Sequence, residues 1–98
     1  MKVVWSDRAL ERVEAIALYI ALDSVDAAAR WGVALFDAVE QLAMFPESGK
    51  AGRDVETPGV REMVWGAYRL FYEVGSDVEI LTVRHGRQRL DEDEFQED

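Results

Sequence analysis

The stretch that decides the fold is residues 60–87, which reads VREMVW (60–65), GAYRLFYEV (66–74) and GSDVEILTVRHGR (75–87). Three short apolar runs are separated by a Gly-Ala corner and a Gly-Ser-Asp corner, a pattern typical of a three-stranded antiparallel meander. Side chains alternate along a strand. One face of the middle run therefore carries Tyr68, Leu70, Tyr72 and Val74, and the other carries Ala67, Arg69, Phe71 and Glu73. Both faces are partly apolar, so we expect helices on one face and a working surface on the other.

The residues before this stretch predict two helices. Ser6 and Ser24 are suitable N-caps, and each is followed by an aspartate in the first helical turn. Apolar residues recur at helical spacing after each cap. The first stripe contains Leu10, Val13, Ile16 or Ala17, and Ile20; the second contains Ala27, Ala28, Trp31, Leu35, Ala38, Val39, Leu42 and Phe45. We expect the first helix to end near Leu22 and the second to be ended by Pro46, because the residue before a proline is pushed out of the helical region.

The order of these elements predicts an α+β fold, β-α-α-β-β-β. The short connection between the helices requires an αα-hairpin. This hairpin packs on one face of an antiparallel sheet. Residues 2–5 form a short edge strand that joins the sheet, and residues 47–59 form a loop. We expect one domain over residues 1–90 and an acidic tail over residues 91–98.

Composition narrows the function. The chain has 98 residues and a formal charge of −9. It has no cysteine and only one histidine, so we expect no disulfide and no metal site, and we expect no cofactor. The absence of cysteine fits a reducing cytoplasm, and we expect neither a membrane span nor a signal peptide. Its negative charge argues against stable DNA binding by the chain alone. Six of the negative charges lie in the tail, at Asp91, Glu92, Asp93, Glu94, Glu97 and Asp98. The tail is most simply a solvated end, and the alternative is that it folds back on the arginines or competes with a nucleic-acid partner.

Four motifs, in order, resemble the RelE/ParE superfamily of toxins from bacterial type II toxin–antitoxin modules. They are the opening VWS (4–6), the FPESG stop (45–49), the pair VRE (60–62) and GAYRLFY (66–72), and the exit ILTVRHGR (80–87). RelE-like members cleave messenger RNA on the ribosome, whereas ParE-like members act on DNA gyrase. The long hairpin and the Phe-Pro-x-x-Gly stop resemble the ParE branch. The resemblance implies a gyrase-binding toxin that a cognate antitoxin neutralises, with a toxin–antitoxin heterotetramer as one arrangement.

The alternative is a RelE-like, ribosome-dependent endoribonuclease. By resemblance Arg61, Arg69 and Arg87 would be its cations, and His85 is the one titratable group that could serve as acid or base near neutral pH. RNA cleavage needs cations for the phosphate and an acid–base pair, and no tyrosine follows Arg87 to complete that pair. We therefore favour a binding protein without chemistry of its own; a third hypothesis is a degenerate member that retains only antitoxin binding.

Several of these side chains also have purely structural interpretations. His85 could bond locally at a strand end, and Arg69 could pair across strands with Glu62, Glu73 or Glu79. Trp31 is expected in the core or the helix–helix contact. The residues expected to contact the antitoxin or the target are Arg61, Trp65, Arg69, Arg84, Arg87 and Arg89.

Overall fold

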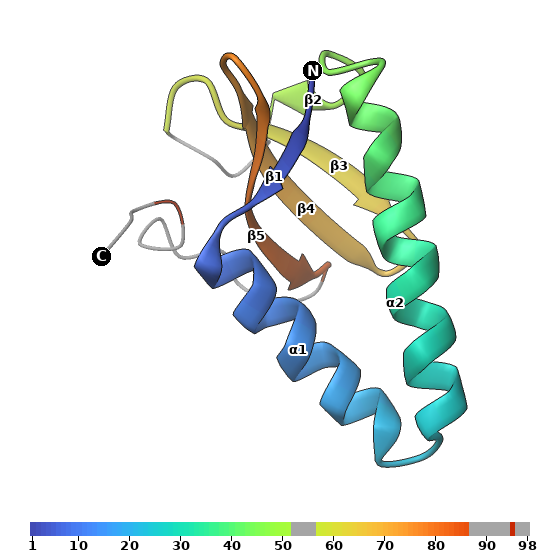
Figure 1. Cartoon of the computed structure of the whole chain (residues 1–98). Coiled ribbons are helices and arrows are strands. Elements are labelled where there is room, and N and C mark those ends of the chain that lie inside the picture. The colour runs from blue at the N-terminus through green and yellow to red at the C-terminus, as the bar shows by residue number, and fades with distance from the viewer. Residues whose placement is uncertain (52–56, 87–94, 96–98) are drawn as a thin grey trace.

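The computed structural model describes residues 1–51, 57–86 and 95. Its elements are β1 (Val3–Trp5), α1 (Asp7–Ala21), α2 (Val25–Glu40), the 3₁₀ helix η1 (Gln41–Ala43), β2 (Lys50–Ala51), β3 (Arg61–Trp65), β4 (Tyr68–Val74) and β5 (Val78–His85). The helical hairpin lies against one face of the sheet, and its tip projects beyond the sheet (Figure 1). The predicted two-layer α+β class is confirmed. No helix within the described ranges has the length and apolar character needed to cross a membrane.

The sheet has five strands in the order β1-β5-β4-β3-β2. The predicted meander is β3, β4 and β5, paired antiparallel. Two details differ from the expected antiparallel sheet. β1 joins β5 in parallel. The elements from α1 to β4 lie between these two strands and form the long crossover that a parallel pair requires. The loop predicted over residues 47–59 contains the two-residue strand β2, which pairs with Arg61 and Glu62.

Both predicted helix caps are present. The Ser6 and Ser24 hydroxyls accept hydrogen bonds from the backbone N–H groups of Ala9 and Ala27, at 3.0 and 3.1 Å. The second helix ends earlier than predicted, since α2 stops at Glu40 and the tighter η1 turn follows before Pro46 is reached.

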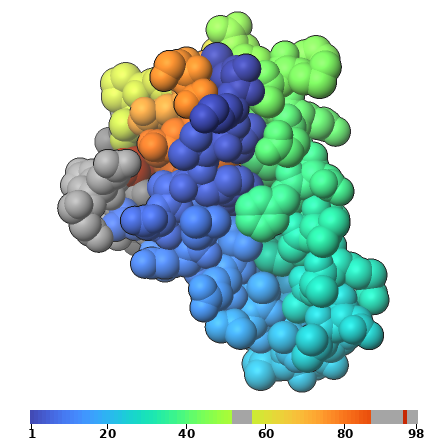
Figure 2. Space-filling view, viewed as in Figure 1, coloured from blue at the N-terminus to red at the C-terminus, as the bar shows by residue number. Residues whose placement is uncertain are grey.

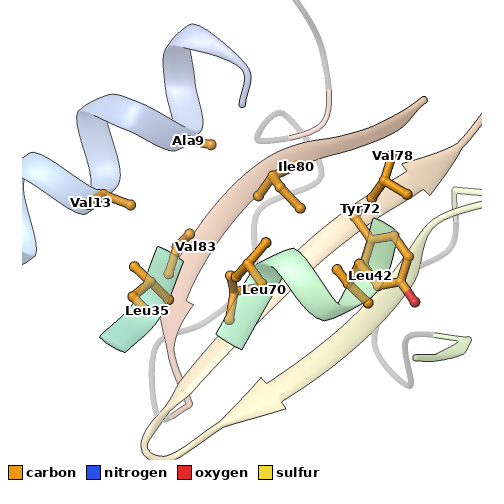
Figure 3. Packing of buried hydrophobic residues seen from close by; sticks show 10 residues of the cluster. Ala9, Val13, Leu35, Leu42, Leu70, Tyr72, Val78, Ile80 and Val83 are labelled. Carbon is orange, nitrogen blue, oxygen red and sulfur yellow. The ribbon is translucent and has the colours of Figure 1, made fainter. Parts of the chain in front are cut away.

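The main core lies between the helices and the sheet. Figure 3 shows Leu35 and Leu42 facing Leu70 and Tyr72 of β4, and all four are buried. Two stripe predictions are wrong, because Leu10 and Phe45 are exposed. Ala9 takes the buried position at the start of α1, and the early end of α2 turns Phe45 outward.

Candidate functional site

The strand register separates the arginines between the two faces of the sheet. Directly opposed residues of an antiparallel pair lie on the same face. Arg61 is opposite Tyr72, a residue of the main core, so Arg61 lies on the helix-covered face. Arg69 is opposite Arg84, and both belong to the outer face, which the helices leave uncovered. The three predicted binding arginines that the structure describes, Arg61, Arg69 and Arg84, therefore do not form one patch.

Arg61 holds the Phe-Pro-x-x-Gly loop. Its Nη1 donates to the carbonyl oxygens of Gly49, at 2.8 Å, and Glu47, at 3.3 Å. Beside it, the Tyr72 hydroxyl donates to the Pro46 carbonyl and accepts from the Gly49 N–H, both at 2.9 Å. These four bonds fix the chain between α2 and β2. Arg61 is thus a residue that organises this loop.

Arg69 forms an ion pair on the outer face. Its Nη2 and Nε lie 2.6 and 3.0 Å from the same carboxylate oxygen of Glu62, and each side chain is only 13% exposed. The Arg69 guanidinium carbon also lies 4.9 Å from the Phe71 ring centroid, a cation–π distance. The cross-strand pairing considered for Arg69 is confirmed, with Glu62 as the partner. A phosphate would have to compete with the Glu62 carboxylate for the Arg69 guanidinium.

His85 lies on the other face from Arg69. It is opposite Tyr68, and the two rings meet edge to face with centroids 5.7 Å apart. It lines a cavity of about 420 Å³ together with Arg12, Ala15, Ile16 and Tyr19 of α1. Arg61 is on the same face but four residues away along the strands, about 13 Å.

The members of the alternative catalytic set that the structure describes, Arg61, Arg69 and His85, are therefore not brought together. Arg87 and Arg89 lie outside the described residues. Within the described part of the chain, no group of three histidines, cysteines or carboxylates is arranged to hold a metal ion.

Trp65 belongs to an aromatic cluster on the helix-facing side. The Trp31 ring of α2 lies 5.3 Å from Tyr68 and 6.4 Å from Trp65, between centroids. All three are half-buried and pack against the main core. The core prediction for Trp31 is confirmed, and the cluster fixes α2 over the β3–β4 hairpin while leaving part of Trp65 accessible.

A group of exposed apolar side chains at the tip of the helical hairpin was not predicted from the sequence. Leu18, Tyr19, Leu22 and Val25, at the tip of the helical hairpin, are 63, 77, 82 and 73% exposed. The tip extends beyond the rest of the molecule in the space-filling view (Figure 2). Contiguous exposed apolar surface of this kind marks protein–protein contact sites. The sequence does show that these apolar residues fall beside the core-facing stripe of each helix. It does not show that the tip of the hairpin projects beyond the sheet, which is what leaves them exposed.

These features define a small α+β protein that exposes apolar side chains at the tip of its helical hairpin and engages Arg61 and Arg69 in structural contacts. Residues 3–90 match the family described as "ParE toxin of type II toxin-antitoxin system, parDE", and the chain belongs to this family. It is 42% identical over 90 residues to the protein named "Putative toxin Y4kP" of Sinorhizobium fredii, covering 90% of this chain and 91% of that protein. It is also similar to a solved chain of the chromosomal ParDE TA system from P. aeruginosa. That match has a TM-score of 0.63 and 27% identity, covering 87% of this chain and 95% of the other.

Proposed function

We propose that this ParE-type toxin inhibits growth by binding DNA gyrase and that a cognate antitoxin neutralises it. The observation that carries the proposal is that Arg61 and Arg69 are already engaged in contacts within the chain. Arg61 is bonded to loop carbonyls on one face, and Arg69 is paired with Glu62 on the other. A ribonuclease would need such cations free to meet a phosphate. Association through apolar surface requires no such rearrangement.

The test of the target is a supercoiling assay with purified gyrase and relaxed plasmid. We expect the toxin to inhibit supercoiling in proportion to its concentration and the added antitoxin to restore it. In parallel, translating ribosomes with the same toxin should yield uncut message. Gyrase that is unaffected by excess toxin, together with cut message, would refute the proposal and support the ribonuclease alternative. Normal growth when the toxin is expressed without antitoxin would instead support the degenerate member.

We further propose that the hairpin tip is an antitoxin contact. A double change, Leu22→Ser with Val25→Ser, removes two exposed apolar side chains and should change folding stability by no more than about 0.5 kcal/mol. We expect it to weaken antitoxin binding at least about tenfold, the loss of roughly 1.4 kcal/mol. Val64→Ser is the matched control, because Val64 is an exposed valine of β3, away from the tip. Unchanged affinity of the double variant would exclude the tip.

This proposal also predicts how binding responds to salt. The affinity that apolar side chains contribute depends little on ionic strength, whereas the attraction between exposed charges is screened by salt. We expect the dissociation constant of the toxin–antitoxin complex to change by less than about threefold between 0.1 and 0.5 M salt. A steep loss of affinity with salt, measured by calorimetry, would show that the arginines dominate recognition.

A further inference from the structure

The strand β1 forms one edge of the sheet that the described residues build. The Lys2 carbonyl accepts a hydrogen bond from β5 at 2.8 Å, and the Ser6 N–H donates one to β5 at 3.0 Å. Backbone groups point to alternate sides along a strand, so those of Val4 also face β5. The N–H and carbonyl groups of Val3 and Trp5 therefore face away from β5, toward the open edge.

The edge that β1 presents is accessible. In the space-filling view β1, in dark blue, lies uncovered on the front of the molecule, between α2 and the β4–β5 turn (Figure 2). Val4 is 41% exposed, and so is 38% of Phe36, whose ring packs on that of Trp5 with centroids 4.6 Å apart. Native proteins often protect an edge strand with a charged residue or a proline. The three residues of β1 include neither, so this edge can template a further strand.

A second copy of the chain matches this edge. Antiparallel pairing centred on Val4 places Val3 of each copy opposite Trp5 of the other. Both of these residues turn their N–H and carbonyl groups to the edge, so each such pair can exchange both of its N–H···O bonds. Val3 and Trp5 pack on the main core, so Val4 lies on the outer face. The two Val4 side chains then lie opposite each other on that face and cover one another.

The charges at the two ends of β1 agree with the same register. Lys2 of one copy lies opposite Ser6 of the second copy and beside that copy's Asp7. Lys2 and Asp7 are both exposed and carry opposite charges. Twofold symmetry forms this contact twice. Lys2 is also the one charged residue between positions 2 and 6, so the register sets no like charges directly opposite each other.

We propose that two copies of this chain associate through β1 and join their five-stranded sheets into one continuous sheet. The paired strand is only three residues long, so the association is weak, with a dissociation constant of about 0.1 mM. The two helical hairpins lie on the same face of the joined sheet. Each hairpin tip is about 20 Å from β1 along the 15-residue helix α1, so the proposed antitoxin contact stays open.

The experiment is sedimentation of the full chain alone, from about 10 µM to 1 mM. Salt at about 0.15 M screens the repulsion between two acidic chains. We expect the wild type to pass from monomer to dimer over this range. Val4→Lys places two ammonium groups opposite each other and should weaken association at least about tenfold. Val64→Lys is the matched control and should associate as the wild type does. It adds the same charge at an exposed valine of β3, which β4 and β5 separate from β1.

A charge reversal tests the register. Lys2→Glu sets a carboxylate beside Asp7 of the second copy and should weaken association. Combining Lys2→Glu with Asp7→Lys restores opposite charges across the pair and should recover most of the lost affinity. A double variant that associates no better than Lys2→Glu alone would refute the register centred on Val4.

Hydrogen exchange provides a measurement that needs no variant. Protection of the Val3 and Trp5 amides should rise with the concentration of the wild-type chain, because both amides donate across the new strand pair. A chain that stays monomeric at about 1 mM would overturn the proposal, and so would equal association of Val4→Lys and the wild type. Protection that appears only when antitoxin is added would also overturn it, since the added strand would then belong to the antitoxin. Gyrase takes no part, so a monomeric toxin that still inhibits gyrase would refute this proposal alone.

Discussion

Replacing Gly49 by alanine tests how the Phe-Pro-x-x-Gly loop is held. An added Cβ would lie 2.7 Å from the Glu62 carbonyl oxygen and 2.8 Å from a ring carbon of Tyr72. The first of these is backbone of β3 and cannot move aside alone. Overpacking of this kind costs about 1–3 kcal/mol. Displacing the loop also weakens the hydrogen bonds of Gly49 to Tyr72 and Arg61, which adds about 1–2 kcal/mol.

We therefore expect Gly49→Ala to lower the free energy of unfolding by about 2–5 kcal/mol and Tm by roughly 10–25 °C. Urea and thermal unfolding followed by circular dichroism measure both. Gly32→Ala is the matched control, because nothing lies within 4 Å of its added Cβ and it sits inside α2. Alanine is the better helix former there, so stability should rise by about 0.5–1 kcal/mol. If the two variants differ by less than about 1 kcal/mol, the loop is not held as described.

Three further substitutions test the two helix caps and the ion pair of the outer face. Ser6→Ala removes the α1 cap together with the hydroxyl's 2.9 Å bond to the Leu81 carbonyl, whereas Ser24→Ala removes only a cap. We expect Ser6→Ala to lower the free energy of unfolding, measured in urea, by about 1 kcal/mol more than Ser24→Ala does. Equal losses would show that the hydrogen bond from Ser6 to β5 adds nothing to stability. Glu62→Gln, which keeps an acceptor for Arg69 but removes the charge, should lower stability by about 1–3 kcal/mol in the same assay. An unchanged urea midpoint for Glu62→Gln would mean that the Arg69–Glu62 pair is exposed to solvent.

The local features of this chain were predictable because neighbouring residues determine them. Ser6 and Ser24 act as caps through a hydroxyl three residues from its donor, and the turn residues separate the strands of the meander. The non-local features were not. The parallel pairing of β1 with β5 joins residues 75 positions apart. The exposure of Phe45 depends on α2 ending at Glu40, and nothing in the apolar stripe marks that end.

The candidate site was predicted as a set of residues but not as an arrangement. Strand alternation alone puts Arg69 and Phe71 on one face of β4. Placing Arg61 on the other face also requires the register across the two-residue turn, which pairs it with Tyr72. The apolar tip was missed for a different reason: periodicity shows which residues of a helix are apolar, but only the packed hairpin shows how far it projects beyond the sheet.

The Arg69–Glu62 pair favours the proposed binding function over the ribonuclease alternative on energetic grounds. For Arg69 to hold a phosphate, the phosphate would have to lie near a carboxylate that is 2.6 Å from the same guanidinium and 13% exposed. Two unit charges of the same sign about 4 Å apart repel by about 4 kcal/mol at an effective dielectric constant near 20. The phosphate contact would have to exceed this repulsion before it could stabilise a transition state. An apolar partner that docks on the exposed hairpin tip meets no such repulsion, since neither Arg69 nor Glu62 lies there.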